Sequence, residues 1–195
     1  MTDLVTGPDG LARCRWGASS PDYVTYHDEE WGRPVRTDDA LFERLTLEAF
    51  QSGLSWITIL RKRPAFRAAF DRFEIAKVAA YDERDVDRLL ADAGIVRNRA
   101  KIEAAIANAR AAADLPDGLA ELLWSFAPPP RHDGRPATGA EIPAVTAESA
   151  AMAKTLRKAG FRFVGPTTAY ALMQATGMVD DHLVGCHVPV AVASR

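Results

Sequence analysis

The chain has 195 residues, of which 48% are hydrophobic and 26% are charged, and its formal net charge is −2. This length predicts one compact domain or two closely packed lobes. The small net charge argues against a protein that coats a polyanion over a broad surface, although it is compatible with a local basic face. We find no apolar run of membrane-spanning length and no signal peptide, and cysteine occurs only twice. We therefore expect a cytoplasmic protein with reduced thiols.

Apolar residues recur mostly at helical spacing, and no sustained alternation predicts a strand, so we predict an all-α fold. Thr37 can cap a helix that stops at Ser52. A second helix starts after Ser55 and is expected to end near Pro64, because proline interrupts helical hydrogen bonding. Residues 128–143 are rich in proline, glycine and charge, which indicates an exposed loop. Further helices are predicted over residues 82–94, 99–113, 119–126, 146–158 and 166–176.

Four residues near the two ends of the chain are candidate ligands of one metal ion. Cys14 and His27 form the pattern C-x12-H, and His182 and Cys186 form H-x3-C. Two imidazoles and two thiolates suit tetrahedral zinc, and four protein ligands leave no position for a catalytic water, so such a site would be structural. Spacing alone leaves open the alternative of two buried thiols and two ordinary histidines, because this is not a standard zinc-finger spacing.

Aromatic residues are concentrated in the first third of the chain. Such a group of rings is most often part of a hydrophobic core. Here the rings lie close in sequence to a candidate metal ligand and to an unusual carboxylate, so a ligand pocket is the second interpretation. The group consists of Trp16, Tyr23, Tyr26, Trp31 and Trp56.

Glu48 is that carboxylate. It follows Leu41 and Leu45 at helical spacing, so it occupies the apolar stripe of its predicted helix. A buried carboxylate without a partner is costly, so Glu48 either forms a buried ion pair, for example with Arg44, or is available to a ligand. A cationic, hydrogen-bonding and flat ligand would satisfy both Glu48 and the aromatic group.

A glycine-punctuated turn over residues 160–165 joins the last two predicted helices. Its glycines allow close approach of another molecule to the backbone, and Pro166 suits the first turn of the following helix, whose free N–H groups favour phosphate. An ordinary helix connection with solvated basic residues is the alternative. Basic residues flank this turn and a second turn at Gly94, namely Arg157, Lys158, Arg162, Arg97, Arg99 and Lys101.

Several ordered segments together resemble the 3-methyladenine DNA glycosylase I family, whose members are helix-hairpin-helix enzymes of base-excision repair. The resemblance extends from Arg13 to Val188. It implies an N-terminal extension over residues 1–12, which family members often lack, and a single glycosylase domain over residues 13–195. The matching segments are Arg13 to Trp16, Tyr26 to Gly32, Leu47 and Glu48 with Gln51, Gly53 to Thr58, Trp124 to Phe126, Gly160 to Gly165, and Asp181 to Cys186.

The resemblance implies specific roles for these residues. It implies one structural zinc ion on Cys14, His27, His182 and Cys186. It also implies a base pocket in which Glu48 acts as the catalytic residue together with Trp16, Tyr23, Tyr26 and Trp56. The implied activity is hydrolysis of the N-glycosidic bond of 3-methyladenine in alkylated double-stranded DNA, which releases the free base and leaves an abasic site. We expect a monomer without membrane association.

Contacts with DNA are expected from two segments. The end of the Glu48 helix is our candidate wedge for the gap left by an extracted nucleotide, through Gln51, Gly53 and Leu54. The turn before the last helix is expected to hold the sugar-phosphate backbone, through Gly160, Val164, Gly165 and Thr167.

Alternative functions make different demands on the same residues. A non-catalytic zinc-containing protein that binds DNA or senses damage would need no base pocket, and a zinc hydrolase would need a water in place of one ligand. The turn contains no well-placed lysine for Schiff-base chemistry, which favours a monofunctional hydrolase over a lyase. Asp180 and Asp181 directly precede His182, so we expect them to support the metal site or cap the chain rather than activate water.

Overall fold

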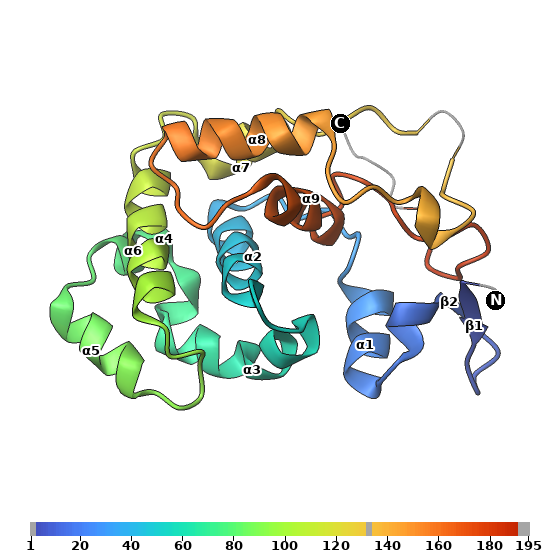
Figure 1. Ribbon diagram of the computed structural model, residues 1–195, viewed down its shortest axis with the longest axis horizontal. Helices are drawn as coiled ribbons and strands as arrows, with labels where there is room; N and C mark the ends of the chain where they lie inside the picture. The colour runs from blue at the N-terminus through green and yellow to red at the C-terminus, as the bar shows by residue number, and fades with distance from the viewer. Residues whose placement is uncertain (1–2, 132–133, 191–195) are drawn as a thin grey trace.

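The computed structural model describes residues 3–131 and 134–190 and is mostly helical (Figure 1). In these residues no helix is long and apolar enough to cross a bilayer. Three short 3₁₀ turns are η1 (Arg15–Ala18), η2 (Asp71–Phe73) and η3 (Gly139–Glu141). The α-helices are α1 (Pro21–Glu29), α2 (Asp38–Gln51), α3 (Trp56–Ala69), α4 (Ile75–Ala79), α5 (Glu83–Ala91), α6 (Arg99–Ala113), α7 (Gly118–Trp124), α8 (Ala147–Lys158) and α9 (Pro166–Ala175).

The prediction of an all-α fold is wrong at the N-terminus. Strands β1 (Leu4–Thr6) and β2 (Ala12–Cys14) form an antiparallel pair in which Leu4 faces Cys14 and Thr6 faces Ala12. Each strand has three residues. That length is too short to show the period-two alternation by which a strand is recognised in sequence.

The long helices begin where their caps predict. Thr37 is the N-cap residue of α2, but its side chain makes no capping hydrogen bond. The predicted ranges of α6, α8 and α9 are confirmed to within one or two residues. The predicted end of α3 is wrong, because the helix passes through Pro64 and continues to Ala69. Phe66 and Ala69 are buried beyond the proline, and their packing outweighs the lost hydrogen bond, which costs about 3 kcal/mol. Helices α1 and α4 were not predicted.

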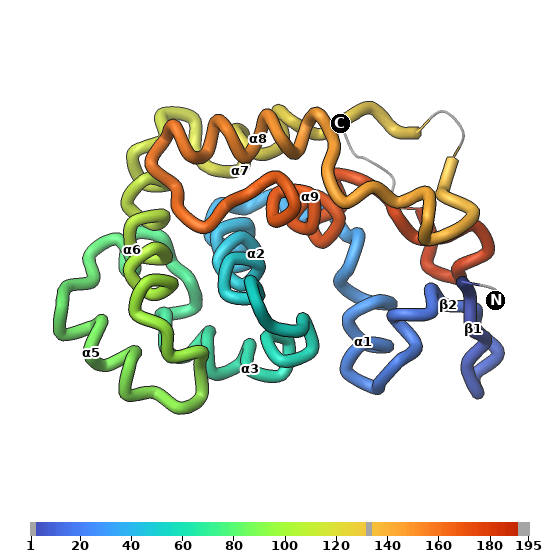
Figure 2. Tube along the Cα trace, in the orientation of Figure 1, coloured from blue at the N-terminus to red at the C-terminus, as the bar shows by residue number. Residues whose placement is uncertain are grey.

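Helix α2 forms the centre of the molecule. It packs against α9, α3, α7 and α6, and Figure 2 shows it enclosed between the upper pair α8 and α9 and the lower helix α3. Its buried apolar side chains meet an aromatic cluster in which the Phe70 and Phe73 rings are 5.4 Å apart and nearly parallel, with an interplanar angle of 3°. Packing in this core sets the rotation of α2 about its axis and therefore the direction in which Glu48 points.

The N-terminal strands and the segment after α9 meet on one side of α2. The segment after α9 returns to the β1–β2 pair, where the N–H of His187 donates to the carbonyl of Ala12 at 2.8 Å. In Figure 1 the strands and α1 lie on the right of the view, whereas α5 and α6 lie on the left. The candidate metal ligands come together where these two segments meet.

Candidate functional site

The four candidate metal ligands lie together and are buried. Their ligand atoms all lie within 4.8 Å of one another. The Cys186 Sγ is 3.6 Å from both His27 Nε2 and His182 Nδ1, and the Cys14 Sγ is 4.0 Å from His182 Nδ1. Metal–ligand bonds of 2.3 Å to sulfur and 2.0 to 2.1 Å to nitrogen give a tetrahedral S···N edge of about 3.6 Å. The donor set therefore fits a tetrahedral soft-metal site.

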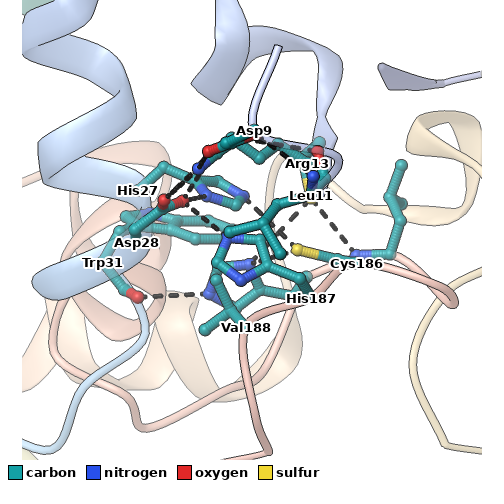
Figure 3. Close-up of polar contacts among 12 residues, drawn as sticks. Asp9, Leu11, Arg13, His27, Asp28, Trp31, Cys186, His187 and Val188 are labelled. Carbon is teal, nitrogen blue, oxygen red and sulfur yellow. Dashed lines mark hydrogen bonds and ion pairs between the residues drawn. The ribbon is translucent and has the colours of Figure 1, made fainter. Parts of the chain in front are cut away.

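The second nitrogen of each histidine makes a polar contact outside the cluster. His27 Nδ1 lies 2.8 Å from Asp28 Oδ1, and His182 Nε2 lies 3.2 Å from the carbonyl oxygen of Trp31 (Figure 3). Each acceptor holds a proton on the outer nitrogen and leaves the inner nitrogen with a free lone pair. Outer partners of this kind orient metal-binding imidazoles. A hydrogen bond from Cys14 also lowers the pKa of the Cys186 thiol, against the opposing effect of burial.

An ion-pair network holds Asp28, the residue that contacts His27 Nδ1. The Arg13 guanidinium is buried between Asp9 and Asp28 and donates to both, at 2.6 Å and 2.7 Å (Figure 3). Burial raises the pKa of Asp28, but the hydrogen bonds from Arg13 and His27 outweigh it and keep the pKa below its usual range. His187 Nε2 approaches Asp28 to 3.0 Å and remains outside the four-ligand cluster.

Gly17 allows the His27 ring to approach the chain next to Trp16. A Cβ at Gly17 would lie 2.4 Å from the His27 ring, a distance that no side chain tolerates. The Trp16 and His27 rings therefore meet edge to face, with centroids 5.2 Å apart. Trp31 makes a similar contact with His182 at 4.7 Å. The two histidines of the candidate metal site thus pack directly against two rings of a neighbouring cavity.

That cavity has a volume of about 500 Å³, within the usual range for small-molecule sites. The structure brings all five predicted base-pocket residues to its wall, namely Trp16, Tyr23, Tyr26, Glu48 and Trp56. Sequence reasoning noted Trp31 among the rings but did not assign it to the pocket. It missed the other pocket residues Gly139, Ile142, Ala171 and Gln174, which come from the loop before α8 and from α9.

The rings of the cavity hold one another at fixed angles. Trp16 meets Tyr23 edge to face with centroids 5.7 Å apart, and Trp31 at 4.9 Å. Tyr26 and Trp56 are 5.5 Å apart on another part of the wall. Such edge contacts leave ring faces available for a flat ligand.

Glu48 is the acidic group of this cavity, and its side chain is 7% exposed. Burial raises its pKa to about 8, and the nearby Arg44 opposes this only partly. Among the described residues, no hydrogen bond to the Glu48 carboxylate is found. The nitrogen of the Trp56 ring is also buried without a partner there. The cavity therefore contains an acidic group that no hydrogen bond from the described residues satisfies.

The alternative ion pair between Glu48 and Arg44 does not form. Arg44 Nη2 instead donates to Glu30 at 2.9 Å, and Arg63 donates to both oxygens of Glu30 at 2.6 Å. Burial raises the pKa of Glu30, but these hydrogen bonds outweigh it and hold the pKa at about 2. Burial and the nearby Glu48 raise the pKa of Tyr26, so its hydroxyl stays protonated.

The predicted wedge lies at the end of α2, next to the cavity. Gln51 lines the cavity, Gly53 has a φ of +81° and Leu54 is 42% exposed. Lys101 donates to the carbonyl oxygens of Phe50 and Ser52, at 2.9 Å and 2.6 Å. Lys101 therefore supports this turn, a role that its basic cluster in the sequence did not indicate.

The turn between α8 and α9 has the backbone features expected of a phosphate contact. Gly160 has a φ of +98°, and Gly165 caps α9 without a side-chain hydrogen bond. Thr167 is exposed, whereas Val164 is buried, so Val164 can offer only its backbone to DNA. Sequence reasoning missed Asn108 of α6, whose buried amide binds both backbone groups of Arg162.

Asp180 and Asp181 are engaged by the protein. Asp180 accepts from the backbone N–H of His182 at 3.1 Å and from Arg135 at 2.9 Å. Asp181 is buried and accepts from Tyr170 and Gln174 at 2.7 Å and 2.8 Å. Neither carboxylate lines the cavity.

The structure is therefore that of a helical protein whose cavity, lined by aromatic rings and Glu48, suits a flat, polar ligand. The family model described as methyladenine glycosylase matches residues 16–189. The chain belongs to this family. It is 47% identical over 179 residues to DNA-3-methyladenine glycosylase 1 of Escherichia coli strain K12, covering 90% of this chain and 96% of the relative. A Haemophilus influenzae DNA-3-methyladenine glycosylase is 40% identical over 182 residues, covering 89% of this chain and 96% of the relative.

Solved structures agree with this assignment. A crystal structure of 3-methyladenine DNA glycosylase I superposes with a TM-score of 0.82 at 46% identity and covers 90% of this chain and 98% of its own. A point variant of 3-methyladenine DNA glycosylase I in complex with 3-methyladenine gives a TM-score of 0.86 at 33% identity and covers 92% of this chain and 99% of its own.

Proposed function

We propose that this protein is a monofunctional DNA glycosylase that hydrolyses the N-glycosidic bond of 3-methyladenine in alkylated double-stranded DNA, as a step of base-excision repair. The observation that carries the proposal is the unpartnered Glu48 carboxylate in an aromatic cavity of about 500 Å³. The family relatives named for this activity, and the relative bound to 3-methyladenine, support it.

The cavity can recognise a methylated adenine by charge and shape. Methylation at N3 leaves the base cationic within DNA, and a ring cation is favoured between aromatic faces and beside a carboxylate. Burial raises the pKa of Glu48 to about 8 in the free protein, and a cationic base favours loss of this proton. The resulting carboxylate accepts a hydrogen bond from the exocyclic amine. Tyr26 and Trp56 line the same wall with their rings, and the raised pKa of Tyr26 keeps its hydroxyl protonated. A normal adenine gains less because it brings no positive charge to Glu48.

The nucleotide has to leave the duplex before it reaches this cavity. Extraction costs a few kcal/mol and is cheapest for damaged bases. Stacking on the pocket rings returns about 1 to 3 kcal/mol per base. The exposed Leu54, beside Gln51 at the cavity, is placed to occupy the gap. The amides at the start of α9, after Gly165, bind the backbone phosphate.

The chemical step requires little acid from the protein. The cationic base is already a good leaving group, so the bond between C1′ and the base breaks with the electron pair going to the base. Glu48 stabilises positive charge on the flipped nucleotide as that bond weakens. Water adds to C1′ and loses a proton, which leaves an abasic site and free 3-methyladenine.

Cys14, His27, His182 and Cys186 would hold one zinc ion. Their S···N separations of 3.6 to 4.0 Å and their burial support a tetrahedral site with four protein ligands. A metal there would be structural, and it would fix Trp16 and Trp31 through their contacts with His27 and His182. The helix-hairpin-helix role of α8 and α9 belongs to the same proposal. A cytoplasmic location, a monomeric state and the division at residue 13 remain predictions.

Base release from methylated DNA tests the proposed activity. The purified protein should release 3-methyladenine, identified by chromatography and mass spectrometry, and should leave abasic sites without strand cleavage. Cleavage at those sites would indicate a lyase. Binding of methylated duplex without any base release would support the non-catalytic alternative. Elemental analysis of the same sample should give one zinc per chain.

A further inference from the structure

Phe163 has an unusual position at the tip of the turn between α8 and α9. Its side chain is 45% exposed, and its backbone has a φ of +55°, the left-handed region that residues with a Cβ disfavour. Exposure of a large apolar ring and a strained backbone are both unfavourable to the isolated protein. Strain of this kind accumulates at positions that serve a ligand.

The strain at Phe163 is imposed by a well-anchored turn. The Asn108 side chain, 1% exposed, donates to the carbonyl oxygen of Arg162 at 3.1 Å and accepts from its N–H at 2.7 Å. Phe161, two residues before Phe163, and Val164, directly after it, are both buried in the main core. The Phe163 ring is therefore held outward by a rigid turn.

The surroundings of Phe163 favour a polyanion with apolar faces. Arg157, Lys158 and Arg162 are exposed around the turn. Helix α9 begins two residues after Val164 with Pro166, and its first turn has neither an acidic residue nor a side-chain cap. Its free N–H groups and positive dipole end suit a phosphate. In a DNA strand the apolar surface next to each phosphate is the C–H face of a deoxyribose.

Helix α6 anchors both the α8–α9 turn and the turn after α2, which contains the candidate wedge residues Gly53 and Leu54. Lys101 binds the end of α2, and Asn108 binds the α8–α9 turn. These two anchors are seven residues apart, so they lie on nearly the same face of α6, separated by about 10 Å along its axis. One rigid helix therefore anchors both turns that are expected to contact DNA.

We propose that the Phe163 ring packs against a deoxyribose of the substrate DNA strand, next to the phosphate held at the start of α9. This inference rests on the proposed function, because it assigns a further contact to the same DNA. The contact compensates for the left-handed backbone at Phe163, which a glycine would adopt without strain.

Phe163→Gly should change stability and DNA affinity in opposite directions. Relief of the strained φ should raise the melting temperature by about 2 to 4 °C, the usual response of a chain of this size to a gain of this kind. Affinity for a fluorescent duplex with one tetrahydrofuran abasic-site analogue should fall about three- to tenfold. Affinity for free 3-methyladenine should not change, because Phe163 does not line the cavity.

Other variants separate the ring from the backbone. Phe163→Tyr keeps the ring and should bind the duplex within twofold of wild type, whereas Phe163→Asn tolerates the left-handed backbone but should bind as weakly as the glycine variant. Leu11→Ala is the control for loss of an exposed apolar side chain, because Leu11 adjoins strand β2, on the opposite side of the molecule in Figure 1.

Salt dependence distinguishes a sugar contact from a phosphate contact. Phe163→Gly should leave the slope of log Kd against log salt unchanged, whereas Arg162→Gln should reduce it by about one. Unchanged duplex affinity of Phe163→Gly would overturn the proposal, and so would a lower melting temperature, which would show that the ring packs on the protein. Failure of the wild-type protein to release 3-methyladenine would instead refute the proposed function.

Discussion

Glu48 lies on the buried side of α2 and lines the cavity, where no described residue forms a hydrogen bond with its carboxyl group. Glu48→Gln keeps the shape of the side chain but cannot ionise, so it removes the carboxylate that a bound cationic base favours. We expect weaker binding of free 3-methyladenine and slower excision, by about 1 to 3 kcal/mol, the usual scale for a hydrogen bond to a charged group. Isothermal titration and single-turnover excision measure the two effects. Wild-type values for both, in folded protein with its metal, would exclude the assigned role.

The raised pKa of Glu48 also predicts a pH-dependent stability. Its pKa rises from 4.5 to about 8 on folding, so the folded state binds a proton that the unfolded state has lost between these values. The contribution of Glu48 to stability is therefore complete below pH 4.5 and is lost as the pH rises toward 8. Its upper bound is about 5 kcal/mol, at 1.36 kcal/mol for each unit of pKa shift.

Urea unfolding of wild type and Glu48→Gln at several pH values tests this linkage. The variant should gain on wild type steadily between pH 5 and pH 8, because glutamine does not ionise. A stability difference that stays constant over this range would show that the carboxylate is solvated or paired in solution.

At the scale of elements, the long helices were predictable and the short elements were not. Helix α2 shows both a cap at Thr37 and a full apolar stripe, whereas α4 and the three-residue strands offer too few residues for any periodicity. Pro64 misled the prediction of α3, because local propensity does not include the burial of Phe66.

Some residues of the candidate site could be predicted from the sequence and others could not. Glu48 and the clustered rings could be found in the sequence because they depart from an ordinary apolar pattern. Ile142, Gln174 and Asn108 look ordinary in sequence, and they matter only because the fold brings distant segments to the cavity and the turn. Lys101 was grouped with basic residues, yet its amino group binds backbone carbonyl oxygens.

The turn before α9 should bind DNA through its backbone. A Cβ at Gly165 would have open space around it, and the φ of Gly165 is −100°, so Gly165→Val should fold. The larger side chain would cover the amides at the start of α9 and lower duplex affinity about tenfold or more. Free 3-methyladenine should still bind as in wild type. An equal loss of both affinities would point to general misfolding.

The metal cluster joins segments that are far apart in sequence, since the contacts of Cys14 with His182 and of Cys186 with His27 span 168 and 159 residues. Cys186→Ser should therefore abolish zinc binding and lower stability by about 3 kcal/mol or more. Val184→Ala, an exposed residue of the same loop, is the matched control. If metal-free protein, verified by elemental analysis, melts at the temperature of the metal-bound form, the structural role is wrong.

At the scale of the whole molecule, the N-terminal extension contacts the wall of the cavity. The Asp3 carboxylate accepts from the N–H of Gly139 at 2.9 Å, and Leu4 packs in a small cluster with Cys14, Cys186 and Ile142. Gly139 and Ile142 line the cavity. The β1–β2 pair therefore connects the metal cluster to the loop before α8.

Asp3→Ala should loosen this loop without unfolding the protein. The lost hydrogen bond is exposed, so the cost in global stability should be about 0.5 kcal/mol, the low end for a single hydrogen bond. The Gly139 amide should exchange with deuterium faster, and affinity for free 3-methyladenine should fall several-fold because the cavity wall becomes less ordered. Thr6→Ala is the control, because Thr6 is an exposed residue of β1 whose backbone pairing is kept. Equal exchange at Gly139 and equal base affinity in wild type and Asp3→Ala would show that the extension does not support the cavity.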